Sequence, residues 1–244
     1  MGLGEVLDTA FQLVRDRAAL LIGIALTVTF PTQLLLVLVE KAASQGSGPV
    51  IVGVGGLALF MIVVSPVVSA AITHAVSETY LDREVGYADS LGRGFKLLLP
   101  LVGTALLMML ILLPATLLLV VPGLYLMFAY LLVNQVIVIE GLVGWSALKR
   151  SFELTRQNML RVLAVYLVSV VIMSVVSMGL SLLSAQVPYL QVVLDAVVQG
   201  ILTAYMSAAL VVLYFDIRCR KEAFDLEHLA GRVGGAEAPA APTA

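Results

Sequence analysis

The chain has 244 residues, of which 61% are hydrophobic and only 12% are charged, and its formal net charge is −2. Soluble domains have about 25% charged residues, and one of this length could not bury so much apolar surface, so lipid must solvate much of the chain. The single cysteine, Cys219, excludes an intramolecular disulfide and argues against a cysteine-based metal site. No basic segment precedes an apolar run at the N-terminus, so we expect no cleavable signal peptide.

The predicted elements alternate between amphipathic segments and apolar spans. Residues 3–17 place apolar side chains on one helical face and charged side chains on the other, which predicts a helix on the membrane surface. A membrane crossing needs about 20 apolar residues. We predict six transmembrane helices, at residues 18–39, 50–76, 97–120, 125–139, 162–183 and 192–215.

The third and fourth spans lie in an uncharged stretch. No Asp, Glu, Lys or Arg occurs between residues 97 and 139. Pro122 and Gly123 are turn formers, so we interpret the stretch as a hairpin that turns at these two residues.

A charged segment, residues 143–161 (VGWSALKRSFELTRQNMLR), separates the fourth and fifth spans. Read as one helix, it places Trp145 and Phe152 on an apolar face and leaves Leu154 as a misfit on the polar face. Similar segments at residues 4–17 and 85–96 precede the first and third spans. The pattern predicts three hairpins, each preceded by a cytoplasmic amphipathic interfacial helix, as a threefold internal repeat with all units in the same orientation.

The distribution of basic residues predicts the orientation. Thirteen of the fourteen Lys and Arg residues lie on one side of the six predicted spans, and only Lys41 lies on the other. The positive-inside rule then places both termini in the cytoplasm. We expect a single membrane domain over residues 1–230, with a cytoplasmic helical extension at 216–230 and a disordered tail at 231–244.

Two sets of residues are candidates for function. Carboxylates and amides inside a membrane are costly and can mark a solute path, although they also join helices. This set is Asp195, Gln199, Asn134 and Gln135. Basic residues of the charged segment can bind anionic lipid headgroups, although they can also only set the topology. This second set is Lys149, Arg150, Arg156 and Arg161.

Several short motifs resemble a bacterial family of six-span proteins, that of the membrane domain of glycerophosphoryl diester phosphodiesterases and its YciC-like relatives. The motifs are Pro122-Gly123, Glu140, Ala147–Ser151, Leu154–Arg156, Arg161–Leu163, the alternating series Tyr214, Asp216, Arg218, Arg220 and Glu222, and Phe224–Glu227. The resemblance implies a multi-pass protein of the bacterial inner membrane without an assigned activity. In some members a separate soluble domain carries the catalysis, so the enzymatic name does not transfer.

We therefore expect a non-catalytic protein, without cofactor or metal, that acts as a scaffold or accessory subunit. Its partners would be the lipid bilayer, with anionic lipids among them, and a membrane or cytoplasmic protein, but no nucleic acid. The alternative is a small transporter or channel for lipid-like or small solutes, built on the intramembrane polar residues. A lipid-modifying enzyme would need a charged cluster at one membrane face, and only the cytoplasmic face has enough charged groups for one.

Overall fold

The structure is a computed structural model that describes residues 2–44, 50–81, 83–184 and 188–235. All regular secondary structure in these residues is helical, which confirms the all-α prediction for the described part of the chain. The helices are α1 (Leu3–Asp16), α2 (Ala18–Ser44), α3 (Val50–Tyr80), α4 (Tyr87–Lys96), α5 (Leu98–Leu118), α6 (Val120–Ala129), α7 (Val133–Gln135), η1 (Val136–Glu140), α8 (Trp145–Arg156), α9 (Met159–Ser184) and α10 (Pro188–Gly235).

Five helical segments of the described residues are long and apolar enough to cross a bilayer, which indicates a multi-pass membrane protein. They are Ala18–Ser44, Leu98–Leu118, Val120–Glu140, Met159–Gly179 and Val192–Lys221. The remaining predicted span, residues 50–76, falls within α3, which packs beside α2.

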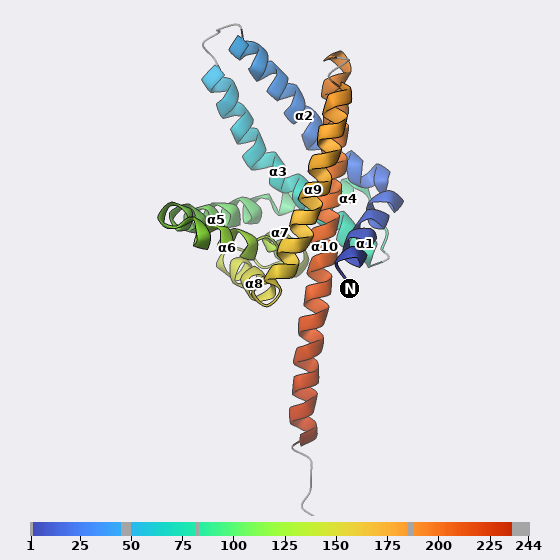
Figure 1. Cartoon of the computed structure of the whole chain (residues 1–244), viewed down its shortest axis with the longest axis vertical. Helices are drawn as coiled ribbons and strands as arrows, with labels where there is room; N and C mark the ends of the chain where they lie inside the picture. Colours follow the sequence, from blue (N-terminus) through green and yellow to red (C-terminus); the bar gives the residue numbers. More distant parts are fainter. Residues whose placement is uncertain (1, 45–49, 82, 185–187, 236–244) are drawn as a thin grey trace, which may run out of the picture.

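Figure 1 shows two directions of helix packing. The long helices α2, α3, α9 and α10 run toward the same end of the molecule, at the top of the view. The short helices α1, α4 and α8 lie lower, and α10 continues far beyond them. The pair α5 and α6 runs across the direction of the four long helices and projects to the left of the view (Figure 1).

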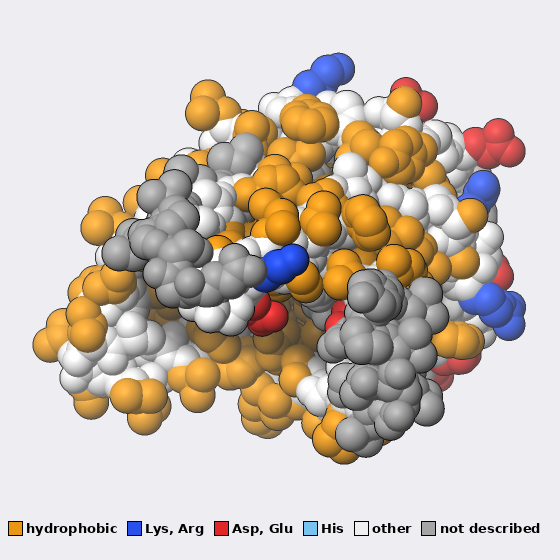
Figure 2. Space-filling model, turned by 90° about the horizontal axis from the view of Figure 1, so that it is seen from above, with side chains coloured by type: hydrophobic (Ala, Val, Ile, Leu, Met, Phe, Trp, Pro, Cys, Tyr) orange, Lys and Arg blue, Asp and Glu red, His pale blue; other side chains and the backbone are white. Residues whose placement is uncertain are grey.

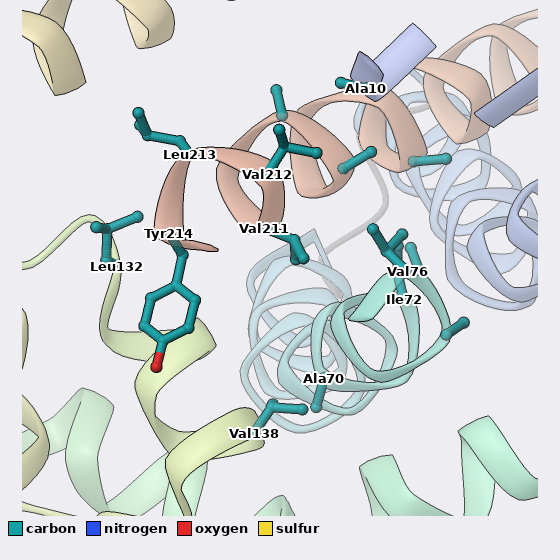
Figure 3. Close-up of a cluster of buried hydrophobic side chains, with 14 of the residues drawn as sticks. Ala10, Ala70, Ile72, Val76, Leu132, Val138, Val211, Val212, Leu213 and Tyr214 are labelled. Carbon is teal, nitrogen blue, oxygen red and sulfur yellow. The ribbon is translucent and has the colours of Figure 1, made fainter. Parts of the chain in front are cut away.

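The core forms around α10, against which α1, α2, α3 and α9 pack, and it extends to the segment from α7 to η1. Val6, Ala10 and Val14 form the buried face of α1. Small residues on α10 let neighbouring helix backbones approach closely, as is usual in lipid. The buried members include Ala204, Ala208 and Ala209. Figure 3 shows Tyr214 pointing from α10 toward the segment that carries Leu132 and Val138.

The turn between α5 and α6 differs from the prediction at Pro122 and Gly123. Leu119 alone is extended, and α6 already begins at Val120, so Pro122 lies in the first helical turn, where its missing N–H costs nothing. A Cβ at Gly123 would collide with Thr116 of α5. The glycine is therefore needed for close helix contact and not for the turn.

The fourth predicted span, residues 125–139, is not one continuous helix. After α6 ends at Ala129, residues 130–132 form a turn, and the chain continues through α7 into the π-helical turn η1. The sixth predicted span and the C-terminal extension, by contrast, are one helix that ends at Gly235. The expected tail thus begins within α10, and residues 236–244 lie outside the described residues.

The charged segment 143–161 is divided between two helices. Helix α8 ends at Arg156, and Arg161 belongs to α9. Leu154, the misfit in the predicted pattern, is 1% exposed in the core, whereas Trp145, on the predicted apolar face, is 64% exposed. In a membrane protein an apolar side chain is suited both to the core and to lipid, so an apolar side chain does not by itself mark the face that packs against the protein.

Candidate functional site: a charged cluster and a membrane cavity

Glu140 is held at the end of the π-helical turn η1. Gly141 follows with a φ of 72°, a left-handed conformation that glycine adopts without steric cost and that ends the helix. The turn thereby directs the Glu140 side chain into the space between α8 and α10, where it is only 11% exposed. Wide helical turns of this kind are frequent at functional sites.

Glu140 joins three elements. The Nε atom of Arg150, on α8, lies 3.0 Å from each carboxylate oxygen. The hydroxyl of Tyr214, on α10, donates to Oε1 at 2.6 Å. Arg218 Nη1, one turn along α10, donates to the same hydroxyl at 3.4 Å. A carboxylate with one arginine and one buried tyrosine thus ties η1 and α8 to α10.

Asp216 forms a second centre on α10. Its side chain is 6% exposed, and Arg161 Nη2, from α9, lies 2.9 Å from Oδ2. Arg220, one turn along α10, donates from Nε to both oxygens at 3.2 and 3.3 Å. This ion pair between residues four apart is the one that the sequence spacing favours.

Together these residues form what we call the charged cluster: Glu140, Arg150, Arg161, Tyr214, Asp216, Arg218 and Arg220. Tyr214 and Asp216 are two residues apart and therefore point about 200° apart around α10. The cluster consequently holds α10 from two sides. Since arginine side chains contact both carboxylates, the arrangement is suited to fixing helices more than to proton transfer.

A cavity of about 420 Å³ lies between α2, α3 and α10. Its lining is apolar with interspersed hydroxyls and amides: Ala25, Val28, Thr29, Thr32, Gln33, Leu36, Met61, Ser65, Val68, Ser69, Gln199 and Thr203. No charged side chain is among these lining residues. Figure 2, seen from the end to which these helices run, shows a hollow near the centre whose visible walls are largely hydrophobic, with basic and acidic side chains at its rim.

The four candidate intramembrane residues are only partly brought together. Gln199 lines the cavity, and Asn134 donates to Oγ of Ser69, another lining residue, at 3.3 Å. Asn134 also lines a second cavity, of about 220 Å³, beside α5 and α6. Gln135 is buried in the core, and its Oε1 has no hydrogen-bond partner among the described residues. Asp195 is half-buried on α10, one turn before Gln199, and does not line either cavity.

The four basic candidates fall into two pairs. Arg150 and Arg161 belong to the charged cluster, with side chains only 24% and 21% exposed. Lys149 and Arg156 are exposed on α8. Lys149 borders a shallow pocket that Trp145 and Phe152 also line. The exposed pair lies on the molecular surface, whereas the cluster pair holds helices together.

The sequence did not single out Glu140, Tyr214 and Asp216 as site residues. The available signal was their place in the motifs quoted for the family resemblance. The motif residues that meet here are spread along 77 positions, and they form two contact groups: Glu140 with Arg150 and Tyr214, and Asp216 with Arg161. No hydropathy pattern could predict these long-range partners.

Comparison with known proteins places the chain in a family. No curated protein and no solved structure matches it. A family model described as a domain of unknown function, DUF7847, matches residues 1–217, which include the helices from α1 to α9 and the cluster residues up to Asp216. Because this match covers most of the sequence, the chain belongs to the DUF7847 family.

Proposed function

We propose that this protein is a non-catalytic, multi-pass membrane protein that acts as a scaffold or accessory subunit and organises lipids or a partner protein. The observation that carries the proposal is the continuity of α10, which runs from Pro188 to Gly235 without a break and projects beyond the rest of the molecule (Figure 1). At 1.5 Å per residue such a helix is about 72 Å long, whereas a bilayer with its headgroups is about 40–45 Å thick.

The charged cluster supports this function because it fixes the direction of the projecting helix. Arg161 of α9 and Glu140 of η1 contact α10 at Asp216 and Tyr214, just before the projecting part. A scaffold needs a rigid arm of this kind, since a freely moving helix would lose conformational entropy when a partner binds. A lipid-modifying enzyme would instead need an available carboxylate at this face, and arginine contacts hold both carboxylates of the cluster.

The proposal includes a location in the cell. We propose that the protein lies in a bacterial inner membrane with both termini in the cytoplasm, as the resemblance and the distribution of basic residues imply. Each of α1, α4 and α8 is followed within two residues by a long helix, which supports the threefold repeat of an interfacial helix and a hairpin. An even number of crossings, whether six or four, leaves both termini on one side.

The test is purification in native lipids followed by mass spectrometry of the lipids and proteins that are retained. The full chain is compared with a chain that ends at Lys221 and with Asp195→Asn as a full-length control. We expect a specific protein or anionic lipid with the full chain and with the control, and loss of the protein partner on truncation. Recovery of neither a specific lipid nor a specific protein would contradict the scaffold function.

A small transporter or channel is the second candidate, and the cavity between α2, α3 and α10 favours it. Gln199 and Ser69, the partner of Asn134, both line this space. Because the lining residues carry no charge, the solute would be neutral or lipid-like. Uptake into proteoliposomes that is lost with Gln199→Leu and kept with Asp195→Asn would support transport, and equal leakage from all three preparations would exclude it.

A further inference from the structure

The pair α5 and α6 is the most apolar exposed part of the described molecule. At its tip, the side chains of five consecutive residues are between 62% and 80% exposed, and all are aliphatic: Leu117, Leu118, Leu119, Val120 and Val121. The link between α2 and α3 has the opposite composition, since residues 40–49 read EKAASQGSGP. A tip in water would be polar like that link, so the occupant that fits the tip of α5 and α6 is hydrocarbon.

Leu119, the one residue between α5 and α6, has its backbone groups hydrogen-bonded to both helices. Leu119 donates its N–H to the carbonyl of Ala115 at 3.2 Å, and Gly123 donates to the carbonyl of Leu119 at 3.4 Å. Both polar backbone groups of Leu119, the residue that links the two helices, therefore have partners. Polar backbone groups without partners are costly in hydrocarbon, whereas a turn in water does not need such bonds.

Three contacts hold α5 and α6 close to the charged helix α8. The rings of Tyr125 and Phe152 pack edge to face with centroids 6.2 Å apart. Ser151 donates its hydroxyl to the carbonyl of Ala129 at 2.9 Å. On the α5 side, the N–H of Gly144 donates to Thr104 Oγ1 at 2.9 Å.

These contacts limit how far the tip can lie from the water surface. Helix α8 carries the exposed Lys149 and Arg156, and such charges require water or headgroups. Tyr125, which contacts α8, is only six residues from Leu119, or about 9 Å along α6. Even with the two side chains added, the tip is closer to α8 than the ~30 Å thickness of the hydrocarbon core. A tip on the opposite membrane face is incompatible with this geometry.

We propose that α5 and α6 form an intramembrane hairpin that lies along the cytoplasmic leaflet, with its tip in hydrocarbon, and returns to the cytoplasmic side without crossing. The orientation in Figure 1 supports this, because the pair runs across the direction of α2, α3, α9 and α10. Helix α6, with ten residues, is about 15 Å long, half the thickness of the core. The chain then crosses the membrane four times, which leaves the cytoplasmic position of both termini unchanged.

The experiment measures membrane depth along α5 and, as a matched control, along α9. Single cysteines are introduced in a Cys219→Ser background at exposed sites, which keeps the core intact. They are Leu99→Cys, Leu110→Cys and Leu118→Cys on α5, and Leu160→Cys, Val171→Cys and Met178→Cys on α9. The outer two sites are about 28 Å apart along α5 and about 27 Å apart along α9. Nitroxide labels in proteoliposomes then report depth from the ratio of oxygen to water-soluble nickel relaxation.

We expect the α9 labels to be deepest at Val171 and shallow at both ends, and the α5 labels to share one depth, with Leu118 dry. Ala43→Cys, exposed near the end of α2, should be reached by nickel and by a membrane-impermeant maleimide from the outer side. Val120→Cys provides a second tip site. A tip that reacts from the same side as Ala43→Cys, or an α5 profile that parallels that of α9, would overturn the proposal. Either result leaves the scaffold function untouched, since that function is tested through α10.

Discussion

The substitution Glu140→Gln tests the charged cluster because it removes one charge and almost no volume. Two unit charges 3.0 Å apart, as in Glu140 and Arg150, attract with about 5.5 kcal/mol at an effective dielectric constant of 20. Burial costs offset part of this attraction, and loss of one partner from a largely buried pair typically destabilises a protein by about 3–5 kcal/mol. With side chains 11% and 24% exposed, we expect the lower end of that range, about 3 kcal/mol.

The matched control is Glu153→Gln on the neighbouring helix α8. Glu153 lies 4.0 Å from Lys149, and these side chains are 45% and 69% exposed, so the change should cost less than about 0.5 kcal/mol. Thermal unfolding in lipid nanodiscs provides the assay. For a chain of this size 1 kcal/mol corresponds to roughly 2–4 °C, so Glu140→Gln should lower Tm by about 6–12 °C and the control by less than about 2 °C.

A double-mutant cycle with Arg150→Gln separates the ion pair from other effects. If the pair is the cause, Glu140→Gln should cost much less in the Arg150→Gln background than in the native chain, with a coupling energy above about 1 kcal/mol. Equal Tm shifts for Glu140→Gln and Glu153→Gln, or additive effects in the cycle, would refute the assignment of the cluster as the element that holds α10.

Three further substitutions test packing and lipid contact. Gly94→Ala should destabilise the protein by about 1–3 kcal/mol in the same nanodisc melts, because the added Cβ would collide with the carbonyl oxygen of Val67. Gly92→Ala on the same helix adds its Cβ to open space, so it should be neutral or stabilise by up to about 1 kcal/mol. Thr104→Val should lower the free energy of unfolding by about 1–3 kcal/mol, since it removes the acceptor for the N–H of Gly144. Amide hydrogen exchange at Gly144 should also quicken. Unchanged exchange would show that the bond is not formed. The double substitution Lys149→Gln with Arg156→Gln should reduce the retention of anionic lipid in native mass spectrometry by about fivefold, because each charge near the membrane surface contributes roughly 1 kcal/mol or less. Arg83→Gln, outside α8, serves as the control. Equal retention in all variants would remove α8 as a lipid contact.

Hydropathy predicted where helices form but not how they are directed. The apolar runs at residues 18–39 and 162–183 correspond to α2 and α9 because length and composition suffice for a helix in lipid. The run at 97–120 has the same composition, yet α5 runs across the long helices. A helix that is apolar on all sides is equally soluble along a leaflet and across a bilayer, so only its contacts with α8 reveal its direction.

The site could be predicted only in its parts. Asp216 and Arg220 are four residues apart, a spacing that favours an ion pair on a helix, and the structure contains this pair. The pairs Arg218–Glu222 and Lys221–Asp225 have the same spacing, but the side chains of Glu222 and Asp225 lie outside the described residues. The contact of Glu140 with Tyr214 joins positions 74 residues apart, and no local periodicity contains such information. Trp145 and Leu154 show the second limit, because one faces outward and the other faces the core although both are apolar.

The continuity of α10 has a mechanical consequence. Gln199 in the cavity wall, Asp216 in the cluster and Gly235 at the projecting end belong to one helix. Asp216 lies about 26 Å from Gln199 and about 29 Å from Gly235 along its axis. With the cluster as pivot, the helix is a lever with nearly equal arms. A molecule that entered the cavity and displaced Gln199 by about 1 Å would move the projecting end by about the same distance in the opposite direction.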